Sequence, residues 1–344
     1  MSLHVCELTP DLAPRWDEFV RCHPYGTPFH TTAWRAVIES TFRYRPLYRA
    51  VTGGGRIRAV VPLFLTEGVV TGRVLVSSPF AVYGGILADS EESRDLLGEH
   101  VAAIGREFRA EYIELRNARP EQCLGWNAVE RYVTFTRPVC PADPERLLDS
   151  LPKKTRNMVR KAMKTPFEVA RVWDTRRFEK LHSLTLRRLG TPSFPPRHFS
   201  SLVRCFGRNV DVCEVWHGGR VAAASMSFIY RGEMHIYYAA ADPELNHLAP
   251  NYRMYFDHLL WAGRLGCSVF DFGRSKLNTG TFDFKRHWGT QMRPLPYEVL
   301  LLSRKEMPNF SPANENFLPA IRIWRKLPLA ITRWVGPRLV RLFP

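Results

Sequence analysis

The sequence predicts an α/β protein made of two similar units followed by a short tail. The order helix, hairpin, strand, helix, strand occurs in the first half of the 344-residue chain and recurs in the second half. A chain of this length exceeds the usual size of one domain, so two domains of about 150 residues are expected. We therefore expect mixed sheets in a first domain at 1–145 and a second at 146–305, with a tail at 306–344.

Residue spacing predicts each element of the first unit. Residues 31–42 have apolar side chains every three or four positions, as in a helix that faces a core. Residues 48–65 form two strand-like runs around three glycines, which predicts a hairpin. The unit is completed by an apolar run at 74–87, an amphipathic helix at 91–110 and a strand at 112–117.

The second unit follows a connector at 138–157 that is rich in proline and charge. The same signals predict a helix at 175–190, three strands within 210–241, a helix at 250–266 and a strand end at 267–273. Two glycines then bracket residues 273–280, which we expect to form a loop rich in hydrogen-bond donors.

The tail at 316–344 has the composition of an amphipathic helix. Apolar residues, Trp324 and Trp334 among them, recur at helical spacing, and the arginines fall largely on the other side. This composition is typical of helices that lie on a membrane surface. A helix packed on the protein body is the alternative, and Pro328 and Pro337 would interrupt a long helix.

Charge and cysteine content restrict the partners and the compartment. The formal net charge of +16 favours polyanions such as phosphorylated substrates, RNA or an anionic membrane. The seven cysteines include no CxxC pair, as expected in a reducing cytoplasm without a zinc site. We find neither a signal-peptide pattern nor an apolar run that could span a bilayer, so a cytoplasmic protein is expected. Motifs of serine hydrolases, zinc proteases and nucleotide-binding loops are also missing.

A basic run at 152–164 is the strongest local charge signal. Lys153, Arg156 and Arg160 are three or four residues apart, so on a helix they form one cationic stripe. Like charges at this spacing repel one another, which favours contact with a phosphate or RNA. A solvated helix face is the alternative.

Residues 270–289, FDFGRSKLNTGTFDFKRHWG, begin with an acid between two aromatic residues. Asp271 lies where a carboxylate needs either a partner or a function. Pairing with Arg274 is the structural alternative, because buried acids are usually paired. Arg274 and Lys276 are candidate substrate-binding residues in the predicted loop.

The same stretch ends with a lysine among aromatic residues. Lys285 lies beside Phe284 and near Trp288, so partial desolvation would suit it for polarising a carbonyl or holding a phosphate. The alternative is an ordinary lysine whose charged end reaches solvent. On a predicted central strand, His235 and Tyr237 are further candidates, although a lone strand histidine is more often a core residue than a general base.

The order of these motifs resembles the FemAB group. The matching segments are PKKTRNMVRKA, YYAAADPE, LLWAGRLGCSVFDFG and FDFKRHWG, and the first half is similar in SPFAVYGGI and YIELRN. The resemblance implies tandem GNAT-fold (acyl-CoA N-acyltransferase fold) domains and acyl transfer, in some members from aminoacyl-tRNA to peptidoglycan precursors. It covers about residues 3–305 and is closest to the subgroup that accompanies PEP-CTERM/exosortase exopolysaccharide systems.

The resemblance also implies roles for single residues. Lys285 matches the lysine that polarises the donor carbonyl, and the main-chain carbonyl of Phe284 would orient the attacking amine. Arg156 and Arg160 match residues near the acceptor. Ile38 stands where peptidoglycan-directed members often have a lysine, and the coiled-coil arm of some members is missing. Both departures favour a surface-polysaccharide intermediate as the acceptor.

The donor is expected to be an aminoacyl-tRNA or another activated acyl donor, with no bound cofactor and no metal. A site for CoA pyrophosphate needs a glycine-rich turn before a helix, whereas residues 244–254 contain a proline and no glycine. We therefore expect acyl or aminoacyl transfer to an anionic, phosphorylated or lipid-linked sugar precursor of the cell envelope or exopolysaccharide. Residues 316–344 would contact the inner face of the cytoplasmic membrane. The alternative is a catalytically silent GNAT-like scaffold that binds an anionic glycolipid or an exopolysaccharide assembly complex.

Overall fold

The computed structural model describes residues 2–68, 71–307 and 318–343. The chain divides into two compact units, the first made of residues 1–130, 295–314 and 338–344, and the second of residues 131–294 and 315–337. The unit borders after residues 130 and 294 lie before the expected domain borders after 145 and 305. Strand pairing explains this difference, because residues 132–138 form a strand of the second unit's sheet.

The first unit contains two sheets, with strand orders β1-β3-β4-β7 and β2-β5-β6-β8-β17-β9. The hairpin predicted at 48–65 is confirmed by the antiparallel pairing of β3 with β4. The strands are β1 (His4–Glu7), β2 (Arg45–Pro46), β3 (Arg49–Gly53), β4 (Arg56–Val61), β5 (Leu63–Gly68), β6 (Gly72–Ser77), β7 (Leu87–Ala88), β8 (Tyr112–Leu115), β9 (Asn127–Val129) and β17 (Tyr297–Leu301).

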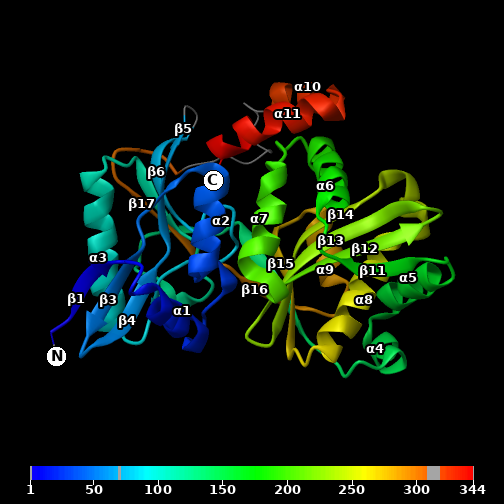
Figure 1. The fold of residues 1–344 in the computed structure, drawn as a ribbon, viewed down its shortest axis with the longest axis horizontal. Coiled ribbons are helices and arrows are strands. Elements are labelled where there is room, and N and C mark those ends of the chain that lie inside the picture. Colours follow the sequence, from blue (N-terminus) through cyan, green and yellow to red (C-terminus); the bar gives the residue numbers. More distant parts are fainter. Residues whose placement is uncertain (1, 69–70, 308–317, 344) are drawn as a thin grey trace. The chain divides into compact units, whose positions relative to one another are not determined.

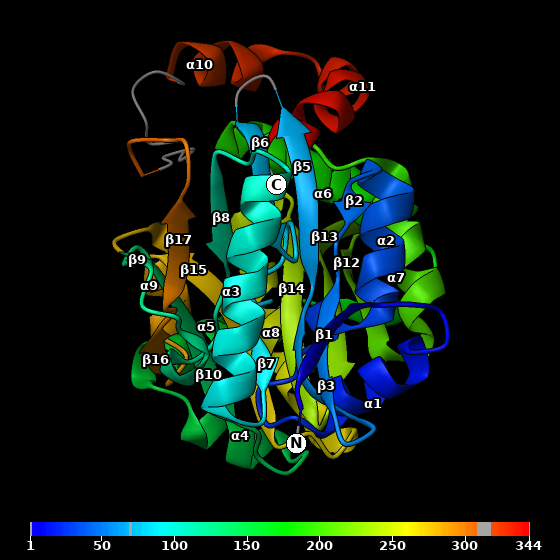
Figure 2. The same cartoon turned by 90° about the vertical axis from the view of Figure 1, so that its left-hand side faces the viewer.

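Helix α3 covers the core of the first unit (Figure 2). It begins after Ser90, whose hydroxyl accepts a hydrogen bond from the Ser93 amide and so caps the helix. Its buried face places Leu97 and Val101 in one cluster with apolar strand residues. The helices of this unit are α1 (Ala13–Cys22), α2 (Thr32–Phe42) and α3 (Glu91–Glu107).

The second unit has one seven-stranded sheet, with the order β11-β12-β13-β14-β15-β10-β16. Strands β14 and β15 are parallel, while each of the other neighbouring pairs is antiparallel. The three strands predicted within 210–241 are confirmed. The strands are β10 (Tyr132–Pro138), β11 (Glu168–Val172), β12 (Val210–His217), β13 (Arg220–Tyr230), β14 (Glu233–Ala241), β15 (Val269–Lys276) and β16 (Gln291–Pro294).

Helices α6 and α7 lie along one face of this sheet, and α8 with α5 lies along the other (Figure 1). The helix predicted at 175–190 is α6, which ends at Gly190 in the left-handed conformation (φ 82°) that favours glycine. The helices are α4 (Pro144–Ser150), α5 (Lys153–Met163), α6 (Arg176–Leu189), α7 (Pro196–Phe206), α8 (Pro250–Arg264) and α9 (Gly280–Arg286).

The loop predicted at 273–280 is wrong at both ends. Strand β15 continues to Lys276, because β10 pairs with it as far as the register pair Tyr132 and Lys276. Helix α9 then begins at Gly280, after Thr279 caps it by accepting a hydrogen bond from the Phe282 amide. Only residues 277–279 separate the strand from the helix.

The tail forms two helices, α10 (Leu318–Lys326) and α11 (Leu329–Leu339), with the break at Pro328 that the sequence predicts. Pro337, where the sequence also predicts an interruption, lies inside α11. Within the second unit, Trp324 of α10 is buried and donates its indole N–H to the carbonyl of Thr191 at 3.2 Å. Arg333 of α11 pairs with the buried carboxylate of Glu179 on α6 at 2.5 Å. No helix in the described residues is long and apolar enough to cross a membrane.

Candidate functional site

The candidate site lies where β14 and β15 stop pairing. Their parallel register covers three residue pairs and ends at His235 opposite Asp271. Beyond this point β14 stays paired with β13, and β15 stays paired with β10. The facing edges of the two strands therefore have backbone groups that need other partners.

Lys285 supplies a partner for the edge of β15. Helix α9 carries this side chain back toward the strand, where its Nζ donates to the carbonyl of Gly273 at 3.0 Å and to that of Arg274 at 2.8 Å. Burial lowers the pKa of Lys285 to about 8, the charge of Asp271 opposes this shift, and Arg274 adds to it. Most of the amine is still protonated at neutral pH, and its two carbonyl partners use two of the three N–H groups of an ammonium.

Gly273 is the point on which this arrangement depends. Its φ of 74° lies in the left-handed region, and a Cβ built there would be 2.9 Å from Nε2 of His235. The Gly273 amide donates to Oδ1 of Asp271 at 2.7 Å, which fixes the unusual turn inside the strand. Only glycine therefore presents the Gly273 carbonyl to Lys285 without displacing the histidine.

Asp271 is buried and has partners on three elements. Its Oδ1 also accepts a hydrogen bond from the hydroxyl of Thr134 on β10 at 3.2 Å, and its Oδ2 lies 3.8 Å from Nδ1 of His235. Burial lowers the pKa of His235, while Asp271 acts in the opposite direction. The Asp271 carboxylate thus links β15 to β10 and β14 next to Lys285. The ring of Tyr237 packs edge-on against the His235 ring at 5.2 Å.

Two further cations continue along β15. The guanidinium of Arg274 lies over the ring of Tyr132 at 4.4 Å. Burial, together with the charges of Arg131 and Arg274, lowers the pKa of Lys276. Strand β15 therefore carries two cations close to the carbonyls that bind Lys285, where the sequence predicts a loop.

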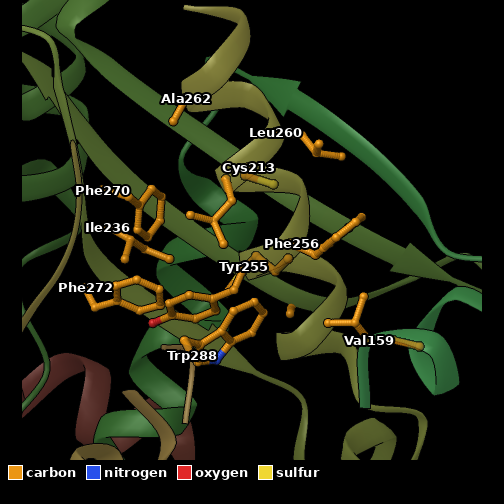
Figure 3. Close-up of a cluster of buried hydrophobic side chains, with 14 of the residues drawn as sticks. Val159, Cys213, Ile236, Tyr255, Phe256, Leu260, Ala262, Phe270, Phe272 and Trp288 are labelled. Carbon is orange, nitrogen blue, oxygen red and sulfur yellow. The ribbon is translucent and has the colours of Figure 1, made fainter. Parts of the chain in front are cut away.

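Aromatic side chains hold α9 and the residues after it. Tyr255 of α8 stacks on Phe272 at 5.5 Å and lies 5.6 Å from Trp288, and the three rings pack together in Figure 3. Phe284 contacts Tyr255 edge-on at 5.1 Å, and Tyr252 stacks on Trp288 at 5.7 Å. This packing fixes the backbone that carries Lys285.

The main-chain carbonyl of Phe284 lies near the C-terminal end of α9, where the last carbonyls of a helix lack intrahelical partners. The next carbonyl, that of Lys285, accepts from the Trp288 amide at 3.1 Å and from the Thr290 hydroxyl at 3.0 Å. Among the residues that the structure describes, none donates a hydrogen bond to the Phe284 carbonyl. An unpaired carbonyl at a helix C-terminus can accept a hydrogen bond from a ligand.

The basic helix α5 is attached nearby but does not bring its cations to Lys285. The Thr155 hydroxyl donates to the carbonyl of His287, just after α9. Arg156 donates to the carbonyls of Asp149 and Leu151, at 2.7 and 3.1 Å, and so closes the C-terminus of α4. Lys153 and Arg160 are exposed. In the described part of the chain, these three cations form no hydrogen bond or ion pair with Lys285, Asp271 or His235.

Sequence reasoning missed the contributions of β10 and α8. Tyr132 and Thr134 alternate along one strand, a signal that the segment YVTFTRP carries but that gives no partner. Tyr252 and Tyr255 are three residues apart on α8, which is the spacing of one helix face. Both signals identify a buried face without showing that it lies beside Lys285.

Comparison with known proteins agrees with this architecture. Residues 151–286 match the model of the acetyltransferase (GNAT) domain family. This segment is therefore similar to a GNAT domain. None of the curated protein sequences compared is significantly similar to the chain.

Solved structures extend the likeness to both units. The crystal structure of FemX is similar with a TM-score of 0.66 and 15% identity, over 87% of this chain and 98% of that one. A tandem GNAT protein from the clavulanic acid biosynthesis pathway has a TM-score of 0.55 and 12% identity, over 87% and 98% of the two chains. The C-terminal domain of a protein named as a lysylphosphatidylglycerol synthetase, from Agrobacterium fabrum, has a TM-score of 0.54 and 12% identity, over 84% and 92%.

These likenesses confirm the predicted fold class, α/β with mixed sheets and two tandem GNAT-like units. The match of residues 151–286 to the GNAT domain model supports a transferase. The matched segment contains β14, β15 and Lys285, so the candidate site lies within the part of the chain that resembles a GNAT domain.

Proposed function

We propose that the second unit transfers an acyl or aminoacyl group from an activated donor to an amine or hydroxyl of a cell-envelope or exopolysaccharide precursor. The observation that carries this proposal is the Lys285 amine, which two main-chain carbonyls hold at the point where β14 and β15 stop pairing. Its third N–H donates to the donor carbonyl oxygen and stabilises the negative charge that develops there. The FemX-like fold supports the aminoacyl form of this transfer.

The reaction is a direct displacement. The nucleophile's electron pair forms a bond to the donor carbonyl carbon, and the bond to the leaving oxygen or sulfur breaks with its pair on that atom. The nucleophile's proton passes to solvent. The Phe284 carbonyl orients the attacking N–H or O–H, while Asp271 and His235 position the strand that holds Lys285. Positioning and charge stabilisation then supply the rate.

The acceptor is expected to be anionic. Arg274 and Lys276 lie on β15, where the Arg274 carbonyl binds Lys285, and Lys153 and Arg160 are exposed on α5. A phosphorylated or lipid-linked sugar carries the complementary charge. On the donor side, Ala249 at φ 63° precedes α8 and Pro250 begins it, in place of a glycine-rich turn, which favours aminoacyl-tRNA or another activated donor over acyl-CoA.

The decisive experiment supplies the protein with labelled aminoacyl-tRNA or acyl-CoA and with extracts of lipid-linked sugars. Label is expected to move from one donor class to the acceptor. Lys285→Met is expected to slow this transfer by about 100- to 1,000-fold, the usual loss when one donor to a developing oxyanion is removed. Lys180→Met, an exposed lysine of α6, is the matched control and should leave the rate unchanged.

An unchanged rate in Lys285→Met would refute the assigned role of the lysine. The second candidate function is the catalytically silent scaffold that binds an anionic glycolipid, which the exposed cations of α5 favour. Binding of the glycolipid without movement of label from any donor would establish that function and exclude the transferase.

A further inference from the structure

Helix α10 of the second unit is fixed by two buried side chains on one face. Ile321 packs against Gly190 so closely that a Cβ on the glycine would collide with it. Trp324 donates its indole N–H to the carbonyl of Thr191 at 3.2 Å. These contacts hold α10 against the residues that follow α6, beyond the end of that helix in Figure 1.

The part of α11 that belongs to the same unit is fixed in a similar way. Arg333 pairs with the buried carboxylate of Glu179 on α6 at 2.5 Å, and the neighbouring Thr332 is fully buried. A Cβ built on Gly336 would be 2.6 Å from the main-chain nitrogen of Ser193, so α11 approaches this segment closely. One side of residues 329–337 is therefore occupied by packing on the second unit.

The opposite faces of the two helices expose large apolar side chains. Ile323 of α10 is 64% exposed, and on α11 Trp334 is 69% exposed and Ile331 is 43% exposed. Successive helical residues are about 100° apart, so Ile323 lies away from the buried face of α10, and Ile331 and Trp334 lie away from that of α11. The packing of the tail on the second unit therefore does not explain why these three side chains are apolar.

The same part of the tail is positively charged. Residues 318–337 contain four lysines and arginines and neither aspartate nor glutamate. Arg322 and Lys326 are exposed one helical turn apart on α10, and within the residues that the structure describes they form no ion pair. Like charges at this spacing repel one another unless an anion lies beside them. Exposed tryptophan and isoleucine next to cations are typical of helices that lie on an anionic membrane.

We propose that the outward faces of α10 and of residues 329–337 bind the surface of an anionic membrane. Ile323, Ile331 and Trp334 enter the lipid interface, and Arg322 and Lys326 lie beside the headgroup phosphates. A nucleic acid would leave the isoleucines in water, and a second copy of a chain with a net charge of +16 would bring like charges together. The proposal concerns this face of the second unit and does not rest on the transfer reaction.

The test replaces the exposed apolar side chains in the full chain, with Ile323→Ser and Trp334→Ser together. Both side chains are exposed, so the fold is expected to persist. Deletion of the tail is a poor test because it would leave the buried Glu179 carboxylate without its counter-ion. Leu265→Ser with Trp173→Ser is the matched control, since it removes two exposed apolar side chains from other parts of the second unit.

Co-sedimentation is measured with vesicles of phosphatidylcholine alone and with vesicles that contain about one third phosphatidylglycerol. The unchanged protein is expected to bind only the vesicles with phosphatidylglycerol. The double variant of the tail should bind them about 30-fold more weakly, because burial of the two apolar side chains supplies much of the attraction. The control should bind within about threefold of the unchanged protein. Equal weakening by the tail variant and its control would overturn the proposal.

The charges are tested by Arg322→Gln with Lys326→Gln. This variant should weaken binding about tenfold or more, since each cation near an anionic surface adds to the attraction. Arg208→Gln with Arg264→Gln removes the same charge from exposed positions elsewhere in the second unit and should have an effect of about threefold or less. Equal weakening by both charge variants would mean that net charge alone drives binding, which would also overturn the proposal.

Further arms identify the partner. Quenching of tryptophan fluorescence by brominated lipid should decrease in Trp334→Phe and stay unchanged in Trp173→Phe, and the reverse result would overturn the assigned face. Self-association that the apolar tail variant abolishes, without any binding to vesicles, would assign the face to a second copy of the chain. Binding of tRNA that the Arg322 and Lys326 variant abolishes, again without binding to vesicles, would assign it to a nucleic acid. Either result would overturn the membrane assignment. Transfer activity is not a readout of this test, so its outcome is separate from that of the proposed reaction.

Discussion

The free energy of unfolding of the protein should rise as the pH increases from 7 to 9.5, and replacing Lys285 with methionine should remove part of this rise. The folded protein holds this amine in a desolvated place where its pKa is about 8, compared with an ordinary value of 10.5. Between these two pH values the unfolded chain keeps the proton and the folded chain loses it. Folding is therefore penalised below pH 8, and the penalty disappears as the pH rises toward 10.5.

The magnitude follows from the two pKa values. Their difference corresponds to about 3 kcal/mol at pH 7, because one pKa unit equals about 1.4 kcal/mol. Between pH 7 and 9.5 the ordinary protein should recover about 2 kcal/mol of this, or about 1 kcal/mol after allowance for the solvent that reaches a partly buried side chain. Methionine has a similar length and no charge, so Lys285→Met should recover none of it.

The assay is chemical denaturation of both proteins at pH 7 and pH 9.5. The free energy of unfolding of the unchanged protein, relative to Lys285→Met, should rise by about 1–2 kcal/mol between the two pH values. Other titrating groups are common to both proteins and cancel in the comparison. If the free energies of unfolding of the two proteins changed equally with pH, the lowered pKa of Lys285 would be refuted. The pKa can also be measured directly from the lysine ¹³Cε resonance that Lys285→Met lacks.

Two other substitutions test the close approach of Gly273 to His235 and the ion pair between Arg333 and Glu179. Gly273→Ala should lower the free energy of unfolding by about 1–3 kcal/mol more than Gly266→Ala, because both glycines have positive φ but only the first would place a Cβ 2.9 Å from His235. Arg333→Met should lower it by about 3 kcal/mol or more, since the Glu179 carboxylate, whose side chain is 4% exposed, would lose its counter-ion. Adding Glu179→Leu to that variant should restore most of the loss; denaturation curves that show no restoration would contradict the pairing.

Local periodicity predicts some of the helices and the hairpin at 48–65, but not α1, α4, α7 or α9. The helix at 91–110 and the three strands within 210–241 have patterns that only one type of element satisfies. The neighbours of β10 could not be predicted in this way. It lies between β15 and β16 in the sheet, and no local pattern specifies a partner more than 130 residues away.

The sequence indicates the environment of Lys285 better than the geometry that holds it. The aromatic neighbours of Lys285 indicate desolvation, and its lowered pKa agrees with that. The sequence predicts a loop that begins at Gly273, yet Gly273 is a strand residue whose positive φ turns a carbonyl toward the lysine. The basic run predicts an anion-binding stripe that includes Arg156, but Arg156 donates to the main-chain carbonyls of Asp149 and Leu151, and side-chain spacing does not reveal carbonyl partners.

Lys285 provides the strongest argument for an enzyme over a scaffold. A desolvated ammonium lowers stability at neutral pH, and an apolar side chain of similar size would fill the same space without that cost. The two carbonyls that hold it are on one strand edge, so they restrict its position while leaving one N–H unused. A scaffold has no need for such a group. A Lys285→Met protein that loses transfer while its pH dependence of stability flattens would show that the amine is retained for chemistry at the expense of stability.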